Sequence, residues 1–207
     1  LSGSITWMPE FSTQSVSAPE VAQGVDAFRR AIGERDDIDG LGRFLTPGFR
    51  PEKLQYVCQA AEIPLTDAGQ WLSDAFRHSD RNLKRGLNWL QKLSGLGPGL
   101  TPSGDDFLGG LMITLHGLGE YDLCRALWGP IRRCTEENSN AISLAHLSAA
   151  ASGVGSASVH RILRAILSGD TNGIMESIDG IAAIGHSSGW DIMTGVITTL
   201  EAWLNVQ

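Results

Sequence analysis

The chain has 207 residues, the size of one domain or of one large and one small domain, and 42% of them are hydrophobic. Its formal net charge is -7 and its pI is near 5.1, which argues against nucleic acid and against a polybasic membrane contact, because both require a basic face. No uninterrupted apolar run reaches the ~18 residues that suggest a membrane span.

Three cysteines, Cys58, Cys124 and Cys134, occur without any C-x-x-C spacing. An odd number in this pattern predicts neither a disulfide framework nor a zinc site. We therefore expect buried, reduced thiols in a cytoplasmic protein.

In chain order, the first third of the sequence predicts short helices. Residues 4–11 are compatible with a short extended segment, and a helix is expected over 19–33, where apolar residues recur at helical spacing. A short helix over 51–61 is expected next. Thr66 and Asp67 can then cap a separate helix.

The rest of the chain also predicts helices. One begins near Ser79, and an apolar helix follows a glycine-rich stretch. Because Gly109 and Gly110 inside that helix each cost roughly 1 kcal/mol relative to alanine, they suggest that another helix approaches closely. The apolar spacing predicts further helices over 121–133 and 141–151, from residue 156 or 158, from residue 171, and from about 188 to 204.

These elements predict a mainly α fold, a compact multi-helix domain with a short strand-containing segment at its N-terminus. We divide the chain into an N-terminal segment and linker, residues 1–50, and a helical domain, residues 51–207. The helical domain carries two glycine motifs.

The first motif is GLGPGLTPSGDDFLGG, residues 95–110. Its glycines allow backbone conformations closed to other residues, and Pro98 fixes one backbone angle. One interpretation is a tight loop before a capped helix. The other is a backbone cradle for a small anion at a helix N-terminus, formed by Gly97, Gly99, Thr101, Ser103, Gly104 and Asp106.

The second motif is GHSSGWDIMTG, residues 185–195, and it repeats the pattern Ser-Gly-x-Asp, two apolar residues, any residue, Gly. The two copies are 85 residues apart, so that Gly104 corresponds to Gly189 and Gly110 to Gly195. A capping box explains Ser-x-x-Asp in each copy. The shared glycine instead favours a pseudo-twofold pair of helices whose positive N-termini face one cavity and bind an anion there.

Candidate site residues come from both motifs. We expect His186 to donate to an oxyanion or move a proton, and Asp105 and Asp191 to join it as catalytic residues. The second copy adds the ligand-binding candidates Ser187, Ser188 and Gly189 to those of the first. The histidines at 78, 116, 146 and 160 lack such a setting.

The adjacent acids of the first motif point about 100° apart on a helix. We therefore expect Asp106 to cap the helix and Asp105 to face the cavity or solvent. Magnesium or manganese held by Asp105, Asp106, Asp191 and His186 is a rival use of these side chains. Our prediction is that the site contains no metal and no cofactor.

With both motifs in this order, the chain resembles the AllH-like family (older name YlbF), mainly over residues 83–204. The resemblance implies a component of oxamate carbamoyltransferase, which converts oxalurate and phosphate to oxamate and carbamoyl phosphate in allantoin degradation, a part of purine catabolism. It implies partner subunits, one of them similar to the FdrA protein. It also implies that residues 1–50 could be the remnant of a strand-rich domain.

On this resemblance, the chain is expected to be a carbamoyltransferase component that binds phosphate or an oxalurate-like anion. The alternative is a non-catalytic small-anion-binding or assembly subunit. Neither motif contains an arginine, and Lys92 is the nearest cation, so partner subunits are expected to supply positive charge.

Overall fold

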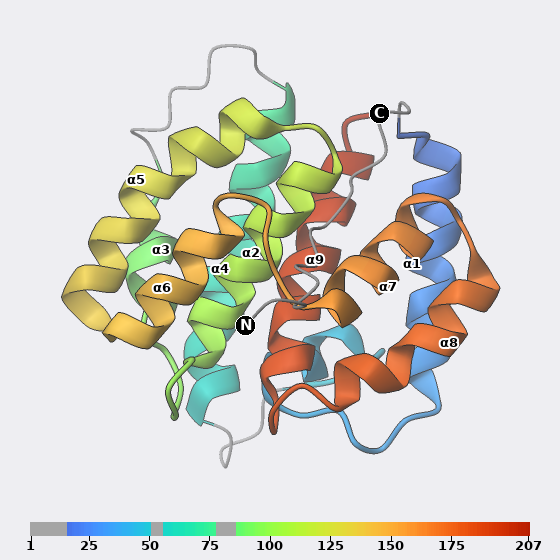
Figure 1. The fold of residues 1–207 in the computed structure, drawn as a ribbon, viewed down its shortest axis with the longest axis horizontal. Coiled ribbons are helices and arrows are strands. Elements are labelled where there is room, and N and C mark those ends of the chain that lie inside the picture. Colours follow the sequence, from blue (N-terminus) through green and yellow to red (C-terminus); the bar gives the residue numbers. More distant parts are fainter. Residues whose placement is uncertain (1–15, 51–55, 78–85) are drawn as a thin grey trace, which may run out of the picture.

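The computed structural model describes residues 16–50, 56–77 and 86–207, and every structural statement below concerns these ranges. All regular elements in them are helices (Figure 1), which confirms the predicted mainly α fold. The expected extended segment over 4–11 lies outside the described residues. The elements are α1 (Ala18–Gly33), the 3-10 helix η1 (Gly40–Leu45), α2 (Tyr56–Arg77), α3 (Asn88–Leu93), α4 (Ser103–Gly117), α5 (Tyr121–Asn138), α6 (Ala141–Ala150), α7 (Ala157–Leu167), α8 (Thr171–Ala182) and α9 (Ser188–Leu204).

Two helices, α4 and α9, form the centre of the molecule and run in the same direction side by side (Figure 1). In α4 every residue except His116 is buried, as expected for a helix that is apolar all round. The helices α3, α5 and α6 lie on the α4 side, and α1, α7 and α8 lie on the α9 side. Each motif therefore begins one of the two central helices.

The central helices touch backbone to backbone through one glycine from each motif. A Cβ atom on Gly110 would lie 2.0 Å from the carbonyl oxygen of Ile192, and one on Gly195 would lie 2.0 Å from that of Phe107. Phe107 and Ile192 are equivalent positions of the two motifs, so the contact is reciprocal. This confirms the predicted close approach at Gly110. At the neighbouring Gly109 a Cβ would meet only side chains, at 3.8 Å or more, so the same prediction is wrong there.

The predicted helix ends agree with the structure in most places and differ in α2 and α3. The start expected near Ser79 lies outside the described residues, and α3 begins only at Asn88, after a bend at Gly86. Helices α1, α7, α8 and α9 begin or end where the sequence indicated. The two helices expected on either side of Thr66 are one helix, with Pro64 inside it. Thr66 does not cap it but donates to the Glu62 carbonyl at 3.0 Å. A continuous buried stripe holds the helix together across the proline, formed by Ala61, Leu65, Ala68 and Leu72.

The described N-terminal part belongs to the same core. Helix α1 buries Val21, Phe28 and Ile32 completely and packs against α7, α8 and α9. The proposed boundary at residue 50 stays a prediction, since residues 51–55 are outside the described ranges. All three cysteines are buried and unpaired, as predicted. Among the described helices, none combines the length and apolar character that a bilayer crossing needs.

Candidate functional site

The starts of α4 and α9 meet. Thr101 lies two residues before α4, and its Oγ1 is 3.3 Å from the Oγ of Ser188, the first residue of α9. The loop before α4 makes this approach with Gly97 at φ +115° and Gly99 at φ +95°, conformations that favour glycine as the sequence indicated. The two motifs therefore form one structural unit.

A glycine presses each helix start against the helix before it. A Cβ on Gly104 would lie 1.8 Å from the carbonyl oxygen of Leu93, at the end of α3. A Cβ on Gly189 would lie 2.0 Å from the carbonyl oxygen of Ile181, near the end of α8. The structural repeat therefore extends beyond the sequence motif and includes α3 and α8.

The backbone N–H groups of these two glycines already donate within the chain. Gly104 donates to the carbonyl of Leu96 at 2.9 Å, and Gly189 donates to the carbonyl of Ile184 at 3.0 Å. Each of these hydrogen bonds closes the loop that precedes its helix. The anion-binding role expected of these two N–H groups is therefore not supported, because each has an acceptor in its own loop.

Asp105 is buried, and both of its carboxylate oxygens accept hydrogen bonds from within the chain. Its Oδ1 accepts from the Gly95 N–H at 2.9 Å, and its Oδ2 accepts from the hydroxyls of Ser139 and Ser143. These bonds join the start of α4 to its own loop and to the α5–α6 connection. The expectation that Asp105 faces a cavity or solvent is wrong, because its side chain is 1% exposed and saturated with donors.

Asp106, the next residue, has one carboxylate oxygen that is not hydrogen-bonded within the described ranges. Its side chain is also 1% exposed, yet no hydrogen bond in the described structure reaches Oδ2. Burial raises its pKa to about 7, a rise to which the Asp191 and Asp105 carboxyls add and which the nearby Ser188 and Thr101 hydroxyls oppose. The expected capping role is wrong, since α4 has no side-chain cap. Asp106 therefore changes protonation near neutral pH inside the molecule.

Asp191, the equivalent acid on α9, anchors η1. Its Oδ1 accepts from the Leu41 N–H at 2.6 Å, and its Oδ2 accepts from the Ser187 hydroxyl at 2.9 Å. Burial raises its pKa, and these two hydrogen bonds oppose the rise. Like α4, α9 has no side-chain cap, so the capping-box interpretation fails in both motifs.

The serine at the start of each central helix lies beside the acid of the other helix. The Ser188 hydroxyl, at the start of α9, is close enough to Asp106 on α4 to lower its pKa. The Ser103 hydroxyl, at the start of α4, does the same for Asp191 on α9. Each helix therefore places a hydroxyl beside the acid of the other, as a pseudo-twofold pair requires.

His146 lies beside this centre, and the sequence did not indicate it. Its Nδ1 is 4.0 Å from Oδ1 of Asp106, and its side chain is 40% exposed. Burial lowers its pKa. On α6, Ser143 and His146 are three residues apart and share one face, so one reaches Asp105 and the other Asp106. That spacing is the signal that could have revealed His146.

His186, the histidine expected to be catalytic, lies at the surface. Its side chain is 92% exposed, and its Nε2 is 3.2 Å from Oδ2 of Asp39. In the part of the chain that the structure describes, no hydrogen bond or ion pair joins it to Asp106.

The arrangement suits proton transfer beside a small anion. Two positive helix ends favour negative charge, hydroxyls from both motifs can donate, and one buried carboxyl titrates near pH 7. Within the described ranges, no three histidine, cysteine, aspartate or glutamate side chains are grouped to hold a metal ion. The absence of a metal and a cofactor stays a prediction.

Comparison with known proteins connects this geometry to a family. No solved structure matches the chain. Residues 93–200 match the family model described as oxamate carbamoyltransferase subunit AllH, a segment that covers more than half of the chain and includes α4, most of α9 and the whole of both motifs. The chain therefore belongs to the AllH family of oxamate carbamoyltransferase subunits.

Proposed function

We propose that this chain is the component of a carbamoyltransferase complex that binds a small anionic substrate where α4 and α9 begin, and that Asp106 moves a proton there with the help of His146. The observation that carries the proposal is the open oxygen of Asp106, buried between two helix starts with no hydrogen-bond donor of its own. A native protein rarely keeps a buried polar atom unpaired without a reason.

The phosphorolysis of oxalurate, which the family resemblance implies, needs such a group. When phosphate attacks the carbamoyl carbon of oxalurate, a C–O bond forms and the C–N bond to the oxamate nitrogen breaks. The monohydrogen phosphate loses one proton, and the departing nitrogen gains one. A single carboxyl with a pKa of about 7 can take the first proton and deliver the second.

The other site residues support this step. The hydroxyls of Thr101 and Ser188 are positioned to donate to the anion, and the helix dipoles favour its charge. His146 links the buried acid to solvent and can reset its protonation between turnovers. Asp105 and Asp191 act as positioning residues, because their oxygens are occupied by the chain itself. Partner subunits supply the cations, as the family description of a subunit allows.

The test uses the assembled complex and follows carbamoyl phosphate formation. Asp106→Asn and His146→Ala should each lower kcat, on the order of 10²–10⁴-fold for loss of a general acid–base group. The matched control is His186→Ala, which removes a histidine from the surface and should leave kcat unchanged. Unchanged activity in Asp106→Asn would reject the proposed role.

The alternative is a subunit that binds an anion or assembles the complex without taking part in the chemistry. The favouring observation is structural: Asp105 ties α4 to the α5–α6 connection through two serines. If Asp106→Asn and His146→Ala abolish assembly rather than turnover, this alternative holds. Size-exclusion chromatography of the variant complexes separates the two outcomes.

A further inference from the structure

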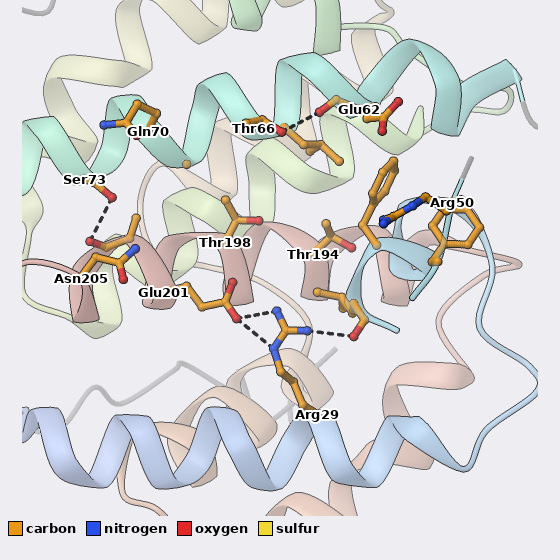
Figure 2. Close-up of a pocket in the computed structure, with 16 residues that line it drawn as sticks. Arg29, Arg50, Glu62, Thr66, Gln70, Ser73, Thr194, Thr198, Glu201 and Asn205 are labelled. Atoms are coloured by element: carbon orange, nitrogen blue, oxygen red, sulfur yellow. Dashed lines mark hydrogen bonds and ion pairs between the residues drawn. The ribbon is translucent and has the colours of Figure 1, made fainter. Parts of the chain in front are cut away.

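A second candidate site lies in a cleft of about 430 Å³ between α2 and α9. Figure 2 shows the two helices facing each other across it, with α1 on the other side of α9. The cleft is narrow at Gly69, where a Cβ would touch Thr198 at an ordinary van der Waals distance of 3.5 Å. The volume is within the usual range for small-molecule sites.

One wall of the cleft is fixed by an ion pair. The Arg29 guanidinium donates to Oε1 of Glu201 through Nε and Nη2, and to the Leu45 carbonyl through Nη1 at 2.9 Å. Figure 2 shows this pair beneath α9. Because these two charges neutralise each other, the pair shapes the wall of the cleft, and other charged groups must select the ligand.

The open charges belong to Arg50 and Glu62. Both line the cleft, both are exposed, and neither side chain makes a hydrogen bond or ion pair within the described structure. Figure 2 shows the Arg50 guanidinium directed into the cleft towards α9, with Glu62 on α2 at the same end. Beside them, the rings of Phe44 and Phe49 meet edge to face with centroids 5.4 Å apart. This end therefore offers one donor cation, one acceptor anion and an apolar surface.

The neighbouring α9 side chains add neutral groups that can both donate and accept hydrogen bonds. Thr198 is half-buried in the middle of the cleft, and its hydroxyl makes no hydrogen bond in the described part of the chain. The side-chain amide of Asn205 is exposed further along the same helix, and it too makes no hydrogen bond within the described residues. A ligand that pairs with all of these groups combines a carboxylate for Arg50, N–H donors for Glu62 and an apolar group.

We propose that this cleft binds a small carboxylic acid that carries an apolar side chain and the N–H donors of an amide or ureide. The carboxylate lies on Arg50 with the charge-assisted geometry that guanidinium groups favour. The N–H groups reach Glu62 and Thr198, and the apolar group packs on Phe44 and Phe49. The site is separate from the Asp106 centre and does not rest on the proposed function.

The probes are N-carbamoyl-L-phenylalanine, L-phenylalanine and 3-phenylpropanoate, measured by isothermal titration calorimetry on the purified chain. They share a ring and a carboxylate and differ in the nitrogen group. N-carbamoyl-L-phenylalanine should bind at least tenfold more tightly than 3-phenylpropanoate, which lacks N–H donors. Equal affinity of these two, tighter binding of the free amino acid, or no binding of any probe would overturn the proposal.

Four variants test whether the probe binds in this cleft. Arg50→Ala should weaken binding tenfold or more, and Gly69→Leu, which fills the cleft, should abolish it. Arg125→Ala removes an exposed arginine that pairs with Asp122 on the same helix, and it should leave affinity unchanged. Asp106→Asn should also leave affinity unchanged, which separates this cleft from the paired helix starts. Binding that survives both Arg50→Ala and Gly69→Leu would reject the cleft as the site.

Discussion

Replacing the two adjacent acids of α4 one at a time should change stability in opposite directions. Asp106→Asn removes a carboxyl that titrates near pH 7 in the folded chain, against an ordinary pKa of 3.8. Since one pKa unit corresponds to about 1.4 kcal/mol, ionised Asp106 destabilises the fold by about 4 kcal/mol. The asparagine avoids that charge but must find an acceptor for its amide. We expect a net stabilisation of about 2–4 kcal/mol at pH 8.

The advantage of Asp106→Asn should depend on pH. The folded pKa lies above the unfolded one, so the folded wild-type chain holds the proton more tightly and loses stability as pH rises from about 4 to 7. At pH 5 folded Asp106 is largely protonated, and the advantage of the asparagine should be smaller by about 2–3 kcal/mol. Urea unfolding at pH 5 and pH 8, followed by far-ultraviolet circular dichroism, measures both values.

The control is Asp105→Asn. Asp105 accepts from Gly95, Ser139 and Ser143, and an amide can replace only one of its two oxygens. We expect a loss of about 1–3 kcal/mol at both pH values, because buried donors remain unsatisfied. The reasoning about Asp106 is refuted if Asp106→Asn destabilises the chain as Asp105→Asn does, or if its effect is the same at pH 5 and pH 8.

Three further outcomes follow from the geometry. Gly110→Ala should destabilise the chain by more than about 3 kcal/mol or prevent folding, since its Cβ would overlap a backbone carbonyl. Gly109→Ala should be neutral or stabilising by up to about 1 kcal/mol, and thermal unfolding measures the contrast. Ser188→Ala should raise the pKa of Asp106, because the hydroxyl lowers it, and the shift is measured by ¹³C NMR of the labelled carboxyl; a lower pKa would contradict the crosswise arrangement. Asp191→Ala should cost about 1–3 kcal/mol and make η1 exchange amide hydrogens faster, and unchanged exchange would show that the anchor is weak.

The sequence predicted the central pair because its signals are local and repeated. The Ser-Gly-x-Asp pattern and the glycine one turn later can be recognised in each copy, and a glycine within a helix implies a close neighbour. The two ends of α9 followed from its apolar periodicity alone. These features depend on residues within a few positions of each other.

The roles of the individual acids could not be predicted in this way. Asp105 and Asp106 are adjacent, and which of them is saturated depends on Ser139 and Ser143, residues brought in by the α5–α6 connection. His146 was missed for the same reason, since its importance comes from an acid forty positions earlier. Likewise, no local pattern shows that Pro64 can lie inside a helix whose buried stripe continues across it.

The two copies of the repeat differ in their loops and in the partners of their acids. The loops differ in length: in the first, Gly104 donates to Leu96, eight positions earlier, and in the second, Gly189 donates to Ile184, five positions earlier. The longer loop brings Thr101 to the partner helix, and the shorter one leaves Ser187 to bind its own acid. The repeated scaffold is therefore asymmetric: the acid of the second copy anchors η1, whereas Asp106, its equivalent in the first, keeps one oxygen without a donor in the described structure.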